Sequence, residues 1–176
     1  MADYDPVAML RVLTQHGVEY VLVGGVAARM RGAPLVTRDV DVAPAMTPGN
    51  LDRLAQALEA LGAKLRTATD PDGVDMPFDP GLLASASMWT LVTDHGDLDL
   101  VMEPAGTGGY RDLMRDADRL KVAVRPELAV DVASLADVIR SKEASGRDKD
   151  RATLPLLRRT LEETAKSRSE GDHGLQ

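Results

Sequence analysis

Two short acidic stretches, each with aspartates at alternate positions between apolar residues, constrain this sequence more than any other feature. They are Asp39-Val-Asp41 and Asp97-Leu-Asp99. Residues i and i+2 of a β-strand point to the same face, so each stretch places two carboxylates on one face, about 6–7 Å apart. Burying neighbouring carboxylates costs free energy through desolvation and repulsion unless a cation lies between them. The pattern therefore predicts two strands with a shared acidic, cation-binding side.

The alternation alone does not decide which aspartate of the second stretch joins the first pair. Asp97 follows a hairpin signal, Asp94-His-Gly96, and is explained equally well as a turn residue. Asp99 lies deeper, between leucines, and we choose it. Mg²⁺ takes carboxylate oxygens together with substrate phosphates, and two such ions stabilise both the attacking and the leaving oxygen of an in-line displacement. For the first pair, an exposed strand edge beside Arg38 is the alternative.

A pair of glycines ends the first apolar run of the chain. Val21–Val23 leads into Gly24-Gly25 and then into a short helical pattern before the first acidic stretch. Glycines at such a junction allow backbone N–H groups to approach a phosphate, although a turn with positive φ explains them equally well. No Gly-Lys-Ser/Thr follows and G-x-G-x-x-G is absent, so neither a P-loop nor a dinucleotide fingerprint is present. Glycines and aspartates together indicate phosphoryl or nucleotidyl transfer.

Hydrophobic periodicity and turn residues predict an α/β (α+β) protein, with a mixed sheet covered by helices. Helices are expected at 5–17, 26–31, 47–62, 81–86, 110–116, 135–145 and 149–166, the last with a break or a later start at Pro155. Strands are expected at 18–23, 38–43, 63–68, 88–93, 97–103, 119–124 and 128–132, and a loop at 70–80. We divide the chain into a core over 1–133, a helical segment over 134–166 and a disordered tail over 167–176.

Composition excludes several kinds of chemistry. The 176 residues include no cysteine, which rules out disulfides, cysteine-ligated zinc and thiol nucleophiles. The three histidines are scattered without metal-ligand spacing. No signal sequence opens the chain and no apolar run approaches a membrane span, so we expect a cytoplasmic protein without a membrane partner.

Charge is distributed unevenly along the chain. The net charge of −7 argues against a broad nucleic-acid-coating surface. Residues 140–159 nevertheless carry a net charge of +4, which leaves −11 for the rest. A local basic segment on an acidic protein fits an anionic ligand bound at one place, and a solvated helix face with i,i+4 ion pairs explains it equally well.

In this order, the motifs resemble the nucleotidyltransferase superfamily, whose pattern is Gly-Gly/Ser, a helix, an Asp-x-Asp strand and a third carboxylate on a later strand. The segment 135–150, a helix with an inward lysine followed by Arg-x-Lys-Asp, looks like the bacterial branch that contains the toxin-type enzymes of toxin–antitoxin and abortive-infection systems. The resemblance covers roughly residues 18–160 and rests on four motifs.

The resemblance implies a nucleotidyltransferase-like fold and a metal-dependent enzyme that transfers a nucleoside monophosphate from a triphosphate such as ATP. The acceptor would be RNA, tRNA or a protein hydroxyl, and an antitoxin protein would be a partner. The alternatives are a small-molecule (antibiotic) nucleotidyltransferase and an inactive nucleotide-binding or partner-binding module of the same fold. Growth inhibition relieved by a neighbouring antitoxin gene would mark the toxin.

The resemblance also implies roles for individual residues. Asp39, Asp41 and Asp99 would bind Mg²⁺, with Mn²⁺ able to substitute and a second metal ion possible, and Asp99 would accept the proton of the incoming hydroxyl. The catalytic set is Asp39, Asp41, Asp99 and Lys142, and the nucleotide-binding set is Gly24, Gly25, Thr37, Arg38, Arg147, Lys149 and Asp150.

One position departs from the family pattern. Many members carry serine directly after the first glycine, where its hydroxyl helps to hold a phosphate, and here Gly25 stands instead. Thr37 is either a hydroxyl near the phosphate or an ordinary β-branched strand residue. Lys142 is otherwise explained as an exposed helix lysine, and Asp150 as an acid stabilised at a helix N-terminus.

Overall fold

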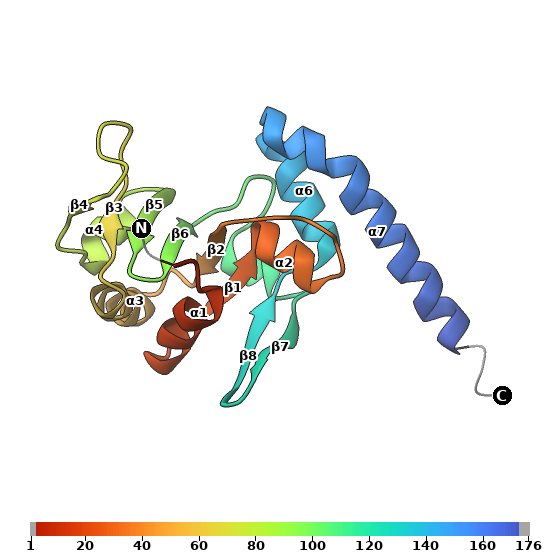
Figure 1. The fold of residues 1–176 in the computed structure, drawn as a ribbon, viewed down its shortest axis with the longest axis horizontal. Coiled ribbons are helices and arrows are strands. Elements are labelled where there is room, and N and C mark those ends of the chain that lie inside the picture. The colour runs from red at the N-terminus through yellow and green to blue at the C-terminus, as the bar shows by residue number, and fades with distance from the viewer. Residues whose placement is uncertain (1–2, 173–176) are drawn as a thin grey trace.

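The protein has a mixed α/β fold built on one sheet, as Figure 1 shows. The computed structural model describes residues 3–172, and within them seven helices surround eight strands in the order β4-β3-β5-β6-β2-β1-β8-β7. The strands are β1 (Tyr20–Val23), β2 (Asp39–Pro44), β3 (Lys64–Leu65), β4 (Val74–Asp75), β5 (Met88–Thr93), β6 (Gly96–Val101), β7 (Asp118–Val124) and β8 (Glu127–Val132). The predicted α/β class with a mixed sheet is confirmed.

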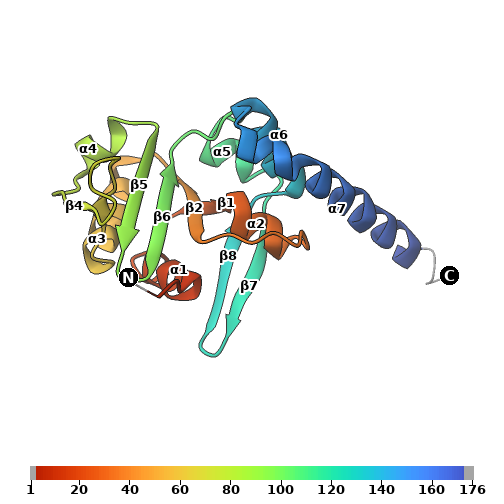
Figure 2. The same cartoon turned by 45° about the horizontal axis from the view of Figure 1, so that its top comes forward.

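The helices lie between and after these strands. They are α1 (Pro6–Gln15), α2 (Gly24–Met30), α3 (Pro48–Ala60), α4 (Pro80–Ala84), α5 (Tyr110–Leu113), α6 (Leu135–Ser145) and α7 (Asp148–Asp172). Figure 2 shows the β5–β6 and β7–β8 hairpins as two separate ribbons, with the C-terminal part of α7 extending away from the sheet. Within residues 3–172, no helix combines the length and the apolar character needed to cross a membrane.

The two acidic strands lie side by side at the centre of the sheet. β2 and β6 are parallel and hydrogen-bonded, with Asp39 opposite Asp97 and Asp41 opposite Asp99. The apolar residues that alternate with the aspartates point to the opposite face and are fully buried in the core: Val40, Val42, Leu98 and Leu100. The alternation in the sequence therefore produces one apolar and one acidic face at this point of the sheet.

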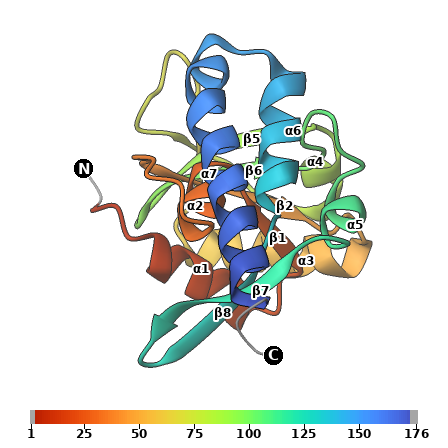
Figure 3. The ribbon, with the colours of Figure 1, turned by 90° about the vertical axis from the view of Figure 1, so that its right-hand side faces the viewer.

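The last two helices form an antiparallel pair, as Figure 3 shows. Ser134 caps α6 by accepting a hydrogen bond from the Asp137 N–H, and Gly146 ends the helix in the left-handed region, with φ of 62°. α6 also contacts α2, which begins directly where β1 ends. The sharp Gly146 turn brings the start of α7 back over α6.

The last helix corrects two expectations. α7 runs without interruption through Pro155, where a break or a later start is predicted, and on to Asp172, through most of the segment predicted to be a disordered tail. Pro155 is exposed, while its neighbours Leu154 and Leu157 are buried, so packing offsets the lost backbone hydrogen bond. Beyond Ser167 the residues extend an existing helix, which costs much less free energy than nucleating a new one. Residues 173–176 lie outside the described residues.

Two other boundaries differ from the prediction. α2 begins at Gly24, so the glycines form its first turn and do not precede it. The segment 70–80, predicted as a loop, contains the two-residue strand β4, which pairs with β3 at the sheet edge. Both residues of β4 are exposed, and backbone hydrogen bonds to β3 hold the strand at the edge of the sheet. A strand of this kind has no buried face, so no hydrophobic pattern in the sequence predicts it.

Asn50 on α3 joins this helix to the start of β1 and the end of β2 by hydrogen bonds, and its replacement tests their contribution to stability. It is fully buried, and its side chain accepts from the Glu19 N–H at 2.7 Å and donates to the carbonyls of Glu19 and Ala45, both at 2.8 Å. We expect Asn50→Ala to lower the free energy of unfolding by about 3 kcal/mol, because buried partners lose their hydrogen bonds. Urea unfolding measures this. Asp52→Ala, on the exposed side of the same helix, should change it by less than about 0.5 kcal/mol.

Candidate functional site

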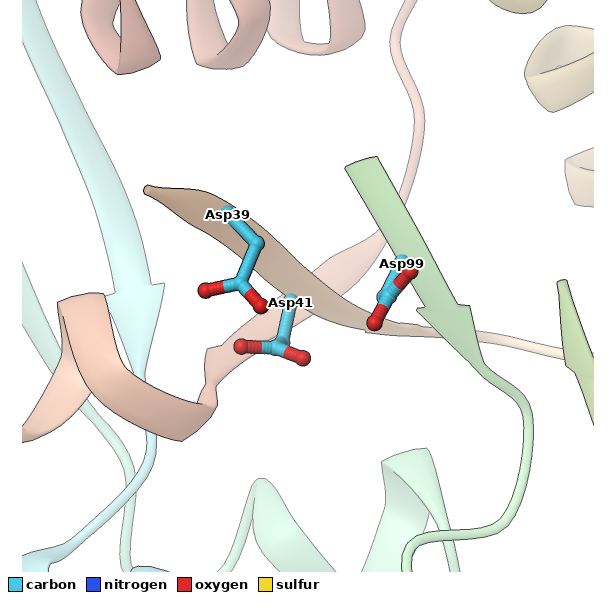
Figure 4. Close-up of side chains that lie close together, drawn as sticks. All are labelled: Asp39, Asp41 and Asp99. Atoms are coloured by element: carbon cyan, nitrogen blue, oxygen red, sulfur yellow. The ribbon is translucent and has the colours of Figure 1, made fainter. Parts of the chain in front are cut away.

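Three aspartates from the central strands meet at one point, as Figure 4 shows. Asp39 and Asp41 project from β2 and Asp99 from β6, and one carboxylate oxygen of each lies within 4.8 Å of the others. All three are partly exposed and border a cavity of about 590 Å³. The parallel register of β2 and β6 creates this arrangement, because it sets Asp41 beside Asp99 on the same face.

Burial and neighbouring carboxylates raise the pKa of two members of this triad, Asp41 and Asp99. Burial and the charges of Asp39 and Asp99 raise the pKa of Asp41 to about 7, against the opposing effect of Lys142 and Lys149. Burial likewise raises the pKa of Asp99 above its ordinary value. Ionisation of Asp41 and Asp99 is therefore disfavoured by their surroundings, and three converging carboxylate oxygens are a donor set that suits a hard cation such as Mg²⁺.

Asp97 shares the acidic face but has its own cation. Arg66, just after β3, donates to both of its carboxylate oxygens, at 2.7 and 2.5 Å. A bidentate guanidinium satisfies both oxygens at once and neutralises the charge. This pair separates Asp97 from the triad and leaves Asp99 as the third carboxylate. No local pattern points to Arg66 as this partner, because it lies 31 residues before Asp97.

Each of the two glycines makes room for a neighbouring side chain. Gly24 has a φ of +64°, and a Cβ there would overlap the Asp41 carboxylate. A Cβ at Gly25 would lie 2.9 Å from both Cβ and Oγ1 of Thr37, closer than real Cβ atoms approach. A larger residue at either position would displace Asp41 or Thr37, so the glycines are required by the packing around the triad.

Lys142 and Arg147 line the cavity, and both form an ion pair with Asp150. Asp150 is 1% exposed, and its carboxylate accepts from Lys142 at 2.7 Å, Ser145 at 2.6 Å and Arg147 at 2.7 Å. Burial alone would raise the pKa of Asp150, but these three hydrogen bonds outweigh it and hold the pKa at about 2. Asp150 thus joins the end of α6 to the start of α7 and is already fully engaged within the protein.

All eleven residues that the sequence singles out border the same cavity, although their surroundings differ. Arg38, Arg147 and Lys149 are exposed, and Gly24, Gly25, Thr37 and Lys142 are half-buried beside the triad. Thr37 precedes β2, so the interpretation as a strand residue is wrong. Its hydroxyl donates to the Asp39 carboxylate.

Sequence reasoning missed Thr90, whose side chain hydrogen-bonds Asp99 and opposes the rise of its pKa. Thr90 lies directly opposite Asp99 in the β5–β6 hairpin. The sequence allows this pairing to be predicted, because a two-residue turn at Asp94-His95 pairs Thr93 with Gly96. That pair sets the register of the whole hairpin, including Thr90 opposite Asp99. Ser145, another missed residue, depends on how α6 and α7 meet and has no such local signal.

The basic segment over 140–159 is largely paired within the protein. Six of its seven cations have a carboxylate within 4.0 Å in the described part of the chain: Arg140, Lys142, Arg147, Arg151, Arg158 and Arg159. Lys149 is exposed, and its charge acts on Asp41 and Asp99. Most of these cations are therefore paired within the protein, but among the described residues only Arg159 forms an i,i+4 pair, with Glu163. Lys142 and Arg158 instead form pairs between α6 and α7.

The comparisons with known proteins add no relative. The sequence matches no protein-family model, and no curated protein is significantly similar to it.

The raised pKa of Asp41 predicts how the stability of the metal-free protein depends on pH. Between about pH 4 and pH 7 the folded chain binds a proton that the unfolded chain has released, so stability falls as pH rises through this range. Asp41→Asn removes this loss and should raise the melting temperature near pH 8 by at least about 2–4 °C, which corresponds to about 1 kcal/mol.

Thermal melting in EDTA at pH 5 and pH 8 measures this difference. Asp52→Asn, an exposed carboxylate on α3, serves as the control and should melt like the wild type at both pH values. An equal decline for wild type and Asp41→Asn would contradict the pKa assignment.

The environment of Asp150 makes a second stability prediction. Asp150→Asn leaves the Lys142 ammonium and the Arg147 guanidinium without their shared carboxylate, and we expect a loss of about 3 kcal/mol. The wild-type contribution should persist above about pH 4 and disappear as pH falls towards 2, where Asp150 itself is protonated. Urea titrations at several pH values measure both effects. Asp148→Asn, whose ion pair is exposed and 3.8 Å long, should change stability by less than about 0.5 kcal/mol.

Proposed function

We propose that this protein is a metal-dependent nucleotidyltransferase that transfers a nucleoside monophosphate from a nucleoside triphosphate to a hydroxyl acceptor. The observation that carries the proposal is the convergence of Asp39, Asp41 and Asp99 within 4.8 Å, in a cavity that Lys142 and Lys149 also border. Carboxylates for cations and lysines for phosphates are what a magnesium–triphosphate substrate requires. The order of the motifs in the sequence supports a nucleotidyltransferase-like fold.

The reaction assigns a role to each group. The acceptor oxygen bonds to the α-phosphorus, the bond from that phosphorus to the bridging oxygen breaks, and pyrophosphate leaves. Mg²⁺ held by the three aspartates would supply charge stabilisation for the attacking and leaving oxygens. Asp99 is suited to accept the proton of the attacking hydroxyl, since burial raises its pKa. Lys142 and Lys149 neutralise phosphate charge, and Asp150 holds Lys142 in place.

The ion pairs of the basic segment favour a compact acceptor. A long RNA binds by neutralising many phosphates with free cations, and six of the seven cations in residues 140–159 already have carboxylate partners in the described chain. A protein hydroxyl or the hydroxyl of a small molecule needs no such surface. We propose these acceptors before RNA, and the toxin of a toxin–antitoxin system as the biological role.

Transfer of label is the test of catalysis. The protein is incubated with Mg²⁺, α-labelled nucleoside triphosphates and, separately, total RNA, a bacterial protein extract and a panel of small polyhydroxylated compounds. We expect label on at least one acceptor class, and a fall of about a hundredfold or more for Asp39→Asn and Asp41→Asn, as for lost electrostatic stabilisation elsewhere. No transfer to any acceptor, with equal nucleotide binding by wild type and variants, would indicate a binding module.

Asp97→Asn is the matched control for these variants. Asp97 lies on the same strand and face as Asp99, but Arg66 occupies both its oxygens. We expect this variant to retain activity within about fivefold, since a residue that makes no transition-state contact contributes little. Equal loss for Asp97→Asn and Asp99→Asn would reject the triad.

The toxin role has a separate test. Induced expression in a bacterial host should inhibit growth for the wild type and not for Asp41→Asn, and a gene adjacent to the native locus should relieve the inhibition. Sequencing of RNA ends and mass spectrometry of proteins after induction then identify the modified acceptor.

A further inference from the structure

Threonine hydroxyls contact both outer carboxylates of the aspartate triad. Thr37 Oγ1 donates to Oδ1 of Asp39, and the side chain of Thr90 hydrogen-bonds Asp99. The two threonines come from different parts of the chain, one from the loop before β2 and the other from the middle of β5. Within the described residues, neither carboxylate has a lysine or arginine within ion-pair distance. The threonine hydroxyls are therefore important for the orientation of Asp39 and Asp99.

We infer that Thr37 and Thr90 are positioning residues, each of which holds one oxygen of an outer carboxylate and leaves the other oxygen directed at the cation site. The inference rests on the proposed metal-dependent function. A hydrogen bond to one oxygen fixes the rotation of the whole carboxylate, because the two oxygens are rigidly joined. Partners of this kind behind metal ligands typically control metal affinity.

The geometry of Thr37 favours a contact with Asp39 over the phosphate contact predicted from the sequence. A hydroxyl has one proton to donate, and the Thr37 proton lies on the Asp39 side chain, with the Asp39 carbonyl 3.3 Å from the same oxygen. Donation to a phosphate would require breaking this bond. Thr37 therefore acts on the nucleotide through Asp39.

Thr90 positions Asp99 as Thr37 positions Asp39, and the pairing of β5 with β6 places it there. It stands directly across from Asp99 in the antiparallel β5–β6 pair, on the same face. Asp41, between the outer two, is held differently: it is enclosed by the backbone of Gly24, where a Cβ would overlap its carboxylate. Each member of the triad thus has its own constraint.

Gly25 completes the support of Thr37. A Cβ at position 25 would lie 2.9 Å from Cβ and Oγ1 of Thr37, and φ at Gly25 is not in the left-handed region, so the backbone itself accepts alanine. The need for glycine at this position comes from Thr37. An alanine there would push the hydroxyl away from Asp39, so Gly25 and Thr37 should act as one unit.

Direct Mn²⁺ binding, measured from the electron paramagnetic resonance signal of free Mn²⁺, tests the inference without an activity assay. We expect Thr37→Val and Thr90→Val each to weaken Mn²⁺ binding about tenfold, as for other partners of metal ligands. Thr37→Ser and Thr90→Ser keep the hydroxyl and should bind within about threefold of wild type. Melting temperatures establish that each variant is folded, and Thr37→Ala provides a second hydroxyl-free variant.

Asp39→Asn separates the two ways in which this test can fail. If the wild type binds Mn²⁺, Asp39→Asn binds it weakly and the folded valine variants bind like the wild type, the positioning role is overturned and the metal site stands. If the wild type itself binds no Mn²⁺, the proposed function and the inference fail together.

A double variant tests the coupling of Gly25 to Thr37. Gly25→Ala should weaken Mn²⁺ binding about as much as Thr37→Val, and the double variant should bind no more weakly than either single one, since both remove the same hydrogen bond. Additive losses would show that Gly25 acts independently of Thr37 and would overturn this part of the inference.

Discussion

Repulsion between carboxylates on two adjacent parallel strands is the constraint on which the centre of this structure depends. β2 and β6 align four aspartates on one face, because their other face supplies fully buried core residues and neither strand can shift by one position without exposing them. The four aspartates differ in how their negative charge is compensated. Arg66 neutralises Asp97 directly, whereas Asp39, Asp41 and Asp99 have no such partner among the described residues, and burial together with the charges of Asp39 and Asp99 raises the pKa of Asp41. The triad is therefore the unneutralised part of a larger acidic surface.

The positive charge that faces this surface comes from the far end of the sequence. Gly146 reverses the chain between α6 and α7, and Asp150 gathers Lys142 and Arg147 at that turn. A buried carboxylate with three donors is a rigid junction, whereas an exposed lysine would be free to move. The helical pair thus supplies a cation at a fixed place, and Lys149 extends beside it as an exposed one.

Local patterns in the sequence were sufficient for the parts of the fold that have a strict period. Alternation identified β2 and β6, and the hairpin position of Asp97 led to the choice of Asp99, although the physical reason is the distant Arg66. Long-range partners leave no trace in a local pattern, which is why Arg66 and Ser145 were missed. The predicted break at Pro155 was wrong for a related reason. The packing of buried Leu154 and Leu157 outweighs the local tendency of proline to interrupt a helix.

The glycine pair shows how one motif can serve the acidic site twice. Gly24 and Gly25 both line the cavity, and their missing side chains leave room for Asp41 and Thr37. Serine at position 25 would bring its own hydroxyl but would collide with Thr37. Glycine at 25 and threonine at 37 are thus alternatives to that serine. In this chain the hydroxyl belongs to Thr37, in the loop before β2, and it donates a hydrogen bond to the Asp39 carboxylate.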